Sequence, residues 1–210
     1  IEGAKVFLGD LTKEEVKLND FLNGADILYH CAGEINNEKL MHSLHVDGTK
    51  KLIKSAYNKI NRWVQLSSVG AYGPHRDGVI TEKTIENPIN LYEKTKTISD
   101  KIVKESGLPY VIIRPSAIFG NNMSNQSIFQ MCAMIQNRYF IYLGKPNPTV
   151  NYIHVDDVVN GMMRSATHVK AVNQTYIINQ SLFLEQMVEK LMEGMNCKNK
   201  IIRLPVMPFK

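Results

Sequence analysis

Three side chains of this sequence could together move a proton at a carbon–oxygen centre: Ser68, Tyr92 and Lys96. Tyr92 and Lys96 are four positions apart, so on a helix the phenol and the ammonium share a face. A nearby positive charge lowers the pKa of a phenol, ordinarily about 10, and makes it usable as a general acid/base. Ser68 follows an apolar run, where its hydroxyl can hydrogen-bond to a substrate oxygen. Taken alone, the Tyr-x-x-x-Lys spacing also arises by chance in a lysine-rich chain, and Ser68 also fits a plain turn.

The elements that must position these residues alternate along the chain. Short apolar runs predict strands, and runs with helical periodicity predict helices. Thr12 and Glu15 have the spacing of a capping box at the start of the first helix. The predicted strands are residues 5–8, 25–30, 62–66, 110–113, 139–143 and 176–178, with a last extended piece at 200–204; the predicted helices are 12–22, 40–58, 91–105, 127–137, 156–166 and 182–193.

Strands that are apolar throughout and separated by helices predict an α/β fold with a parallel sheet covered on both faces. Right-handed crossovers place the carboxyl ends of all strands on one edge, where ligands bind. Four segments follow strand ends and are therefore expected to converge: residues 9–10, 30–33, 67–68 and 114–116.

The composition excludes several classes of protein. Of the 210 residues, 44% are hydrophobic and 21% charged, which is ordinary globular composition. No apolar run reaches the roughly 18 residues of a membrane span, and no signal peptide is evident. Three scattered cysteines predict neither disulfides nor a metal site, and favour the cytoplasm. The net charge of +5 suits an anionic cofactor or simply a solvated lysine-rich surface, and no basic stripe indicates nucleic acid.

The order of the short motifs carries more information than any one of them. The chain contains, in sequence, Gly-Asp-Leu, His-x-Ala-Gly, Val-Asp-Gly-Thr, Ser-Ser-x-x-x-Tyr-Gly, Tyr-x-x-x-Lys, Arg-Pro-x-x-x-Phe-Gly and Tyr-Ile-His-Val-Asp-Asp. This series resembles the extended short-chain dehydrogenase/reductase family of the NAD-dependent epimerase/dehydratase type. The resemblance spans nearly the whole chain and implies a Rossmann-like core with a small substrate lobe.

The resemblance assigns roles to particular positions. It implies catalytic roles for Ser68, Tyr92 and Lys96, with Tyr92 and Lys96 also contacting an NAD or NADP cofactor. The remaining cofactor contacts that it implies are Asp10, Leu11, Cys31, Ala32, Gly33, His45, Pro115 and Ser116. His45 stands where relatives carry a cofactor-contacting Asn, although a helix-surface histidine explains it equally well. His154, Asp156 and Asp157 are expected to serve structure, with Asp156 as a helix N-cap.

The resemblance begins at the family's third strand, so the expected Gly-x-x-Gly-x-x-Gly turn that receives the pyrophosphate is not among these residues. We therefore expect a dinucleotide-binding core, incomplete at its N-terminus, over residues 1–120 and about 150–180. A substrate lobe, incomplete at its C-terminus, is expected over 121–149 and 181–210. The residue by which relatives discriminate between NAD and NADP belongs to the part of the family pattern that precedes the third strand, which these residues do not match.

Two departures bear on the reaction. Val69 and Gly70 occupy the positions of the acid–base pair that related dehydratases use, which disfavours water elimination. Val150 stands where many nucleotide-sugar epimerases carry a diphosphate-clamping arginine. Another cation, such as Lys145 or Arg138, would then have to hold a diphosphate.

Three functional hypotheses follow. The first is an epimerase or ketoreductase acting on a nucleotide-activated sugar, as in polysaccharide biosynthesis. The second is reduction of a non-nucleotide carbonyl, as in steroid-dehydrogenase or flavonol-reductase-like branches, which Val150 favours. The third is a non-catalytic cofactor-binding or scaffold protein. The resemblance also implies a homodimer through helices 40–58 and 91–105.

Overall fold

The chain forms two compact units. The computed structural model describes residues 3–13, 18–75, 78–121, 123 and 127–205. Unit 1 comprises residues 1–115 and 159–178, and unit 2 comprises residues 116–158 and 179–210. The chain leaves unit 1 after the fourth apolar run of the sequence and returns to it through a helix that begins in unit 2.

Unit 1 contains the parallel sheet that the sequence predicts. Its strands are hydrogen-bonded in the order β1-β2-β3-β7, and every neighbouring pair is parallel. The elements of unit 1 are α1 (Leu18–Phe21), β1 (Ile27–His30), α2 (Glu38–His42), the π-helical turn η1 (Ser43–Gly48), α3 (Thr49–Ala56), β2 (Arg62–Leu66), the 3-10 turn η2 (Val69–Tyr72), α4 (Leu91–Glu105), β3 (Tyr110–Pro115), the later part of α6 (Val155–Thr167), the 3-10 turn η3 (Val169–Ala171) and β7 (Gln174–Ile178). The α/β fold class is therefore confirmed.

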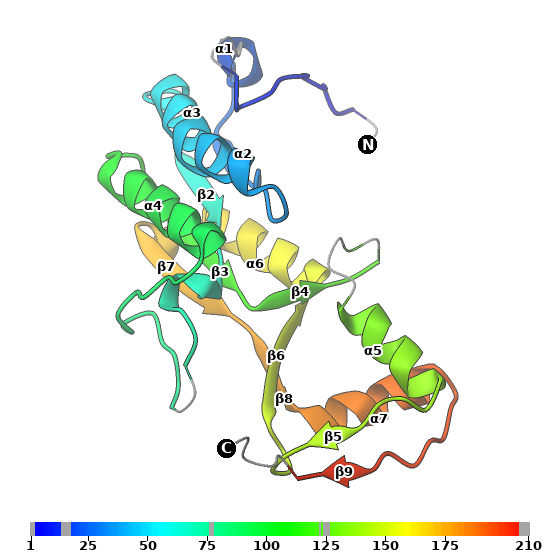
Figure 1. Ribbon diagram of the computed structural model, residues 1–210. Helices are drawn as coiled ribbons and strands as arrows, with labels where there is room; N and C mark the ends of the chain where they lie inside the picture. Colours follow the sequence, from blue (N-terminus) through cyan, green and yellow to red (C-terminus); the bar gives the residue numbers. More distant parts are fainter. Residues whose placement is uncertain (1–2, 14–17, 76–77, 122, 124–126, 206–210) are drawn as a thin grey trace. The chain divides into compact units, whose positions relative to one another are not determined.

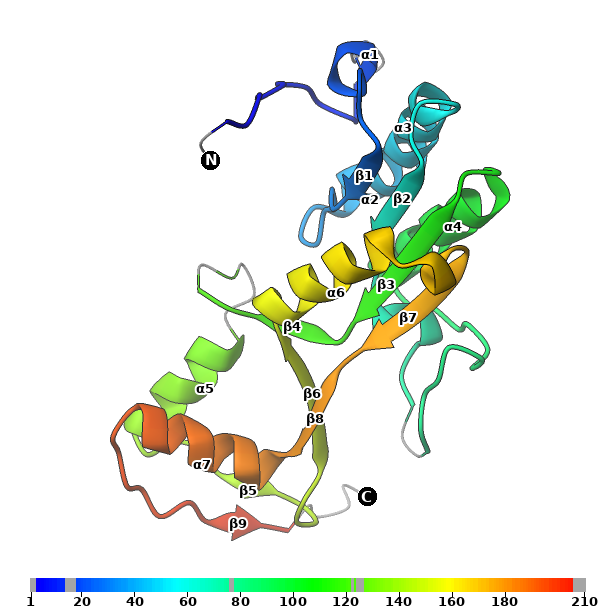
Figure 2. The ribbon, with the colours of Figure 1, turned by 180° about the vertical axis from the view of Figure 1, so that it is seen from behind.

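Helices cover both faces of this sheet. The run α2–η1–α3 and helix α4 lie side by side on one face (Figure 1), and the unit 1 part of α6 lies on the other (Figure 2). The core on the first face is a cluster of buried apolar side chains that includes Leu52, Trp63 and Val103. Because each strand is covered, the β3 burial pattern is nearly continuous, as expected for a parallel strand.

A buried polar chain crosses the same interior. The Trp63 indole N–H donates to Gln65 Oε1 at 2.9 Å, and the Gln65 amide donates to Ser99 Oγ at 2.9 Å. Ser99 Oγ lies 2.9 Å from Thr49 Oγ1, which donates to the His45 carbonyl at 2.6 Å. Each of these buried polar groups thereby gains a hydrogen-bond partner. The series of hydrogen bonds therefore fixes β2, α4 and η1 relative to one another.

Unit 2 is a smaller assembly of a mixed sheet and helices. Strand β6 pairs in parallel with β4 and in antiparallel with β8, and β5 pairs with β9. The elements of unit 2 are β4 (Ala117–Phe119), α5 (Ser127–Gln136), β5 (Tyr142–Leu143), β6 (Thr149–His154), the first residues of α6, β8 (Gln180–Phe183), α7 (Leu184–Gly194) and β9 (Arg203–Leu204). The sequence did not predict β4, β6 or β8, whose strands are only half-buried and so lack a continuous apolar run.

Of two elements predicted near the N-terminus, the strand 5–8 is wrong and the helix 12–22 is found only in part. Residues 5–8 do not form a strand: Val6 and Leu8 are 78% and 97% exposed, and β1 pairs only with β2 among the described residues. A strand needs a neighbour's backbone groups, and no described strand offers them to this segment. Helix 12–22 is found only as α1 from Leu18, and the proposed capping residue Glu15 lies outside the described residues.

The helices that carry the site match the sequence closely, with two local corrections. Helix α4 covers the predicted 91–105 and is held at its start by a capping box between Asn90 and Glu93. The predicted helix 40–58 instead begins at Glu38, capped by the Asn37 side chain, and passes through the π turn η1. Asp156 is not an N-cap, since α6 begins at Val155 and the Asp156 N–H is accepted by His154 Nδ1 at 3.3 Å.

Candidate active site

Ser68 and Tyr92 meet at the carboxyl end of β2, in unit 1. The Ser68 backbone is extended, and its Oγ accepts from the Gly70 N–H at 3.1 Å, which caps the turn η2. The Ser68 hydroxyl also lies close enough to the Tyr92 phenol, on the first turn of α4, to lower its pKa. The hydroxyl and the phenol are therefore adjacent, as required of two groups that act on one substrate oxygen.

Lys96 reaches the same strand end from the next turn of α4. Its side chain is buried, and Nζ donates to the Leu66 carbonyl at 2.6 Å. Burial lowers the pKa of Lys96, while the negative charge of Asp100 raises it. Asp100 therefore acts against the desolvation that would otherwise discharge the ammonium.

The pKa of Tyr92 is raised, not lowered as the sequence predicts. Burial is the main cause of the raised pKa, the nearby Ser68 hydroxyl opposes it, and the negative charge of Asp100 adds to it. The Lys96 charge is not among the causes, which is consistent with Nζ being held by the Leu66 carbonyl. Tyr92 is therefore a neutral phenol at neutral pH, the form that can donate a proton.

A buried ion pair lies behind these residues. The Arg114 guanidinium donates from Nε and Nη2 to Asp100 Oδ2, at 3.1 and 2.9 Å, and Ser67 Oγ donates to the same oxygen at 2.7 Å. Nη2 also donates to Glu86 Oε1 at 2.5 Å, and the guanidinium lies over the Tyr72 ring. These charged contacts fix the carboxyl ends of β2 and β3 against α4.

Asp100 and Glu86 were not singled out from the sequence, and Ser67 was named only as part of the strand-end segment 67–68. Asp100 could have been found, because it lies one turn after Lys96 and so shares a helix face with it. Glu86 could not have been found, since it belongs to the loop before α4 and meets Arg114 only through the fold.

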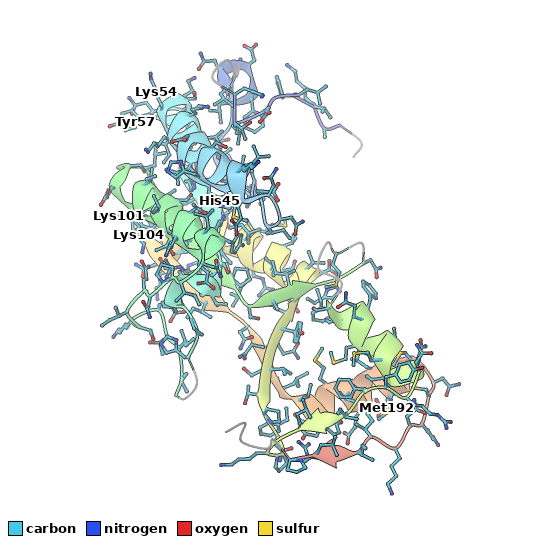
Figure 3. The ribbon with its side chains drawn as sticks, viewed as in Figure 1. His45, Lys54, Tyr57, Lys101, Lys104 and Met192 are labelled. Atoms are coloured by element: carbon cyan, nitrogen blue, oxygen red, sulfur yellow. The ribbon has the colours of Figure 1, made fainter. Side chains whose placement is uncertain are left out.

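His45 is buried rather than on the helix surface, so that interpretation of it is wrong. It is 1% exposed, and its Nε2 accepts from the Glu34 N–H at 2.8 Å. Its Nδ1 lies 2.8 Å from Thr95 Oγ1, and its ring is edge-on to Tyr92 with centroids 5.7 Å apart. Figure 3 shows His45 where η1 comes alongside α4.

The hydrogen bonds of His45 define its protonation. Nε2 is an acceptor, so the neutral ring carries its proton on Nδ1 and donates to Thr95. Burial and the Lys96 charge lower the pKa of His45 to about 4. The ring thus links the loop after β1 to the helix that carries Tyr92 and Lys96, as a neutral bridge.

Three predicted cofactor contacts line one cavity. Leu11, Cys31 and Ala32 belong to the wall of a hollow of about 200 Å³ beside β1. Its mostly apolar wall suits a planar heterocycle such as adenine, so these residues fit the predicted group. Asp10 is exposed, and its Oδ1 accepts from the backbone N–H and the hydroxyl of Thr12, at 2.9 and 2.7 Å.

The remaining predicted contacts are spread over two units. Gly33 directly precedes Glu34, whose backbone N–H donates to His45 Nε2. A Cβ atom added at Gly33 would lie 3.6 Å from His45 Nε2. Pro115 is the last residue of β3, in unit 1, whereas Ser116 is the first residue of unit 2. Ser116 is 7% exposed, and its Oγ has no hydrogen-bond partner among the described residues.

A family model for NAD dependent epimerases and dehydratases matches residues 1–179. The chain belongs to this family. The resemblance inferred from the motifs is thus confirmed, and with it the cofactor class of the family, NAD or NADP.

Curated relatives within this family match at low identity. The sterol-4-alpha-carboxylate 3-dehydrogenase (decarboxylating) of Mus musculus is 25% identical over 178 residues, 78% of this chain and 48% of the relative. The 3 beta-hydroxysteroid dehydrogenase/Delta 5-->4-isomerase of Mycobacterium tuberculosis is 22% identical over 201 residues, 84% of this chain and 54% of the relative. The chain spans about half the length of such relatives.

Solved structures share the fold. The UDP-glucuronic acid 4-epimerase of Bacillus cereus, in complex with NAD, superposes with a TM-score of 0.76 at 16% identity over 94% of this chain and 68% of its own. RMD of Pseudomonas aeruginosa, complexed with NADPH, gives a TM-score of 0.75 at 18% identity over 95% of this chain and 76% of its own. At these identities the likeness establishes the fold alone.

Two further features are not found in the described residues. Among the described residues, no cluster of three or more His, Cys, Asp or Glu is arranged to hold a metal ion. In the same part of the chain, no helix is both long and apolar enough to cross a membrane.

Proposed function

We propose that this chain contributes the proton-transfer site of an NAD(P)-dependent oxidoreductase that interconverts a secondary alcohol and a ketone. The observation that carries the proposal is the adjacency of Ser68 and Tyr92 at the end of β2, with buried Lys96 on the next turn of α4. A nicotinamide, when bound, supplies the hydride for reduction or accepts it in oxidation. Lys96 would hold its nicotinamide ribose with Tyr92 beside it, and Asp10 and Leu11 would contact its adenine. Cys31, Ala32 and Gly33 would line the path of its phosphates and ribose.

The chain's own residues supply the rest of the reaction. In reduction, the Ser68 hydroxyl donates to the substrate carbonyl oxygen, since Ser68 Oγ already accepts from Gly70. As negative charge grows on that oxygen, Tyr92 gives it the phenolic proton and becomes a phenolate. Lys96 stabilises the phenolate by its positive charge, so the proton transfer costs less.

The decisive experiment removes one oxygen atom. Tyr92→Phe keeps the ring and the shape but deletes the proton, so we expect turnover by the protein to fall by about 10²–10⁴-fold. Dinucleotide binding measured by calorimetry should change little. Tyr139→Phe is the matched control, because Tyr139 is 75% exposed and belongs to unit 2. Full activity in Tyr92→Phe, or an equal loss in both variants, would refute the assignment.

The substrate class is the finer part of the proposal. We favour a non-nucleotide carbonyl compound, because Val150 replaces a clamping arginine and because the curated relatives above act on sterols and steroids by name. A nucleotide-activated sugar is the second candidate, supported by solved relatives such as the UDP-glucuronic acid 4-epimerase. Turnover assays with UDP-sugars and with alicyclic ketones separate the two.

A homodimer through α2–η1–α3 and α4 remains a proposal. Apolar side chains on these helices are exposed, among them Leu40, Tyr57 and Ile98 at 40%, 56% and 43%. Lys54 and Tyr57 project from α3, and Lys101 and Lys104 from α4 (Figure 3). Analytical ultracentrifugation of Ile98→Lys against wild type tests the interface, since a buried charge would shift the protein to monomer. The cytoplasm as its location also stays a prediction.

A further inference from the structure

Two of the three cysteines belong to unit 2, on segments that lie side by side although they are far apart in the sequence. Cys132 is part of α5, and Cys197 follows α7. Both thiols are free and half-buried. The third cysteine, Cys31, is exposed and belongs to unit 1. The proton-transfer chemistry makes no use of the pair in unit 2.

The segments that carry Cys132 and Cys197 run in the same direction. Strands β5 and β9, which follow them along the chain, pair in parallel. Closer to the cysteines, the Asn199 side chain donates from Nδ2 to the Ile135 carbonyl at 2.5 Å. Cys132 and Cys197 come directly before this contact, each on its own segment. Figures 1 and 2 both show the chain after α7 passing beside the C-terminal half of α5.

The side chains of both cysteines point towards the neighbouring segment. Cys132 precedes the buried Ile135 by one helical turn and therefore lies on the same face of α5. Cys197 and Asn199 are half-buried while residues 198 and 200 are exposed, which is the alternation of an extended chain. Cys197 therefore points to the same side as Asn199, towards α5. Burial raises the pKa of Cys132, and the charge of the nearby Cys197 raises it further.

Cys197 is the cysteine of this pair that a dissolved reagent reaches first. It lines an open recess of about 680 Å³ at the end of α7, whereas Cys132 does not contribute to that wall. The Cys197 N–H donates to the carbonyl of Met192, another residue of the wall, at 3.0 Å (Figure 3). Charged residues of both signs complete the wall: Lys198, Lys200, Glu189 and Glu193. A small disulfide that carries carboxylates and ammonium groups therefore finds partners for both.

From this arrangement we infer that Cys132 and Cys197 form a reversible disulfide within unit 2, by exchange with a low-molecular-weight disulfide. The Cys197 thiolate attacks one sulfur of the external disulfide, which gives a mixed disulfide and releases one external thiolate. Cys132 then loses its proton and attacks the Cys197 sulfur, and the second external thiolate leaves. Two protein thiols are thereby oxidised to one disulfide, and the external disulfide is reduced to two thiols, which take up the two protons.

The disulfide would add a covalent link where the structure has only weak ones. The Asn199–Ile135 hydrogen bond and the short β5–β9 ladder already join the two segments. A bond between Cys132 and Cys197 would fix α5 to the chain after α7 and so constrain this edge of unit 2. The inference does not depend on the proposed function, because Ser68, Tyr92 and Lys96 belong to unit 1.

The test uses the wild-type chain and needs no substitution. The folded protein is treated with glutathione disulfide, alkylated, digested without reduction and mapped by mass spectrometry. We expect the peptides of Cys132 and Cys197 to be linked directly, with glutathione on neither. In urea, loop-closure entropy favours one of the three possible cysteine pairings over another by no more than a factor of about four. The preference for the 132–197 pairing should therefore fall at least about tenfold on unfolding.

Two variants test the order of the steps. Cys132→Ser removes the thiol that resolves the mixed disulfide, so glutathione should remain on Cys197 until dithiothreitol removes it. Cys31→Ser is the matched control and should form the 132–197 bond like the wild type, because Cys31 belongs to the other unit. The inference is overturned if the folded wild type gives no 132–197 link, if it gives the same mixture of pairings as in urea, or if Cys132→Ser keeps no glutathione on Cys197.

Discussion

The two units differ in the kinds of side chain that they bury. Unit 1 buries charged and polar groups, including Lys96, Asp100 and Arg114, and gives nearly all of them partners from at least three elements. Unit 2 encloses a hollow with hydrocarbon walls and one exposed lysine at its edge. Unit 1 therefore holds its charged groups in fixed positions, whereas unit 2 contains a hollow lined mostly by hydrocarbon.

The largest effect should come from breaking the buried ion pair of unit 1. Arg114→Met leaves the Asp100 carboxylate buried without its cation, which typically costs about 3–5 kcal/mol of unfolding free energy. Urea unfolding followed by the fluorescence of Trp63, the single tryptophan of the chain, reports unit 1 directly. Glu105→Gln serves as control, because its pair with Lys101 is exposed and should contribute about 0–1 kcal/mol. Equal stability of both variants would show that unit 1 does not depend on its buried charges.

The same substitution placed in each unit sharpens the contrast. Val111→Leu adds a methylene to a fully buried strand of unit 1 and should destabilise it by about 1–3 kcal/mol. Val150→Leu adds the same group beside the hollow of unit 2, where space is free, and should be neutral or slightly stabilising. Urea unfolding followed by Trp63 fluorescence measures the first, and hydrogen exchange of the β6 amides measures the second. A large loss at Val150 would mean that the hollow is filled in solution.

A smaller, pH-dependent effect should distinguish the units further. In unit 1, burial lowers the pKa of His30 to about 3 and that of His45 to about 4, against about 6.5 in the unfolded chain. The unfolded state therefore binds more protons below pH 6.5, so stability falls as the pH is lowered from 6.5 towards these values. The expected slope is roughly 1.4 kcal/mol per pH unit for each histidine.

His45→Asn is the variant that tests this slope. It should reduce the slope between pH 6 and about 4 by roughly half, as measured by urea midpoints followed through Trp63. His75→Asn is the control, because His75 is exposed and accepts or donates only to its own loop, at Gly73. If the dependence of stability on pH were unchanged in His45→Asn, groups other than His45 would be responsible for it.

The sequence by itself determined the periodic elements and the linear motifs. Helix α4 was predicted with its observed ends, because apolar periodicity is a local signal. The capping box between Asn90 and Glu93 was not used in that prediction, although it too is encoded locally. Strand β2 was likewise predicted at its observed limits, because a run of buried residues needs no partner to be recognised. The order of the motifs was enough to give the family.

Only the tertiary structure decided the electrostatics and the empty space. The sequence predicted a lowered pKa for Tyr92, but burial raises it, and burial depends on what the fold places around the ring. The partners of Arg114 and His45 come from loops and helices far away in the chain, so no local spacing encodes them. The hollow of unit 2 was likewise invisible in a list of apolar residues, because side chains that pack together and side chains that surround a cavity have the same composition.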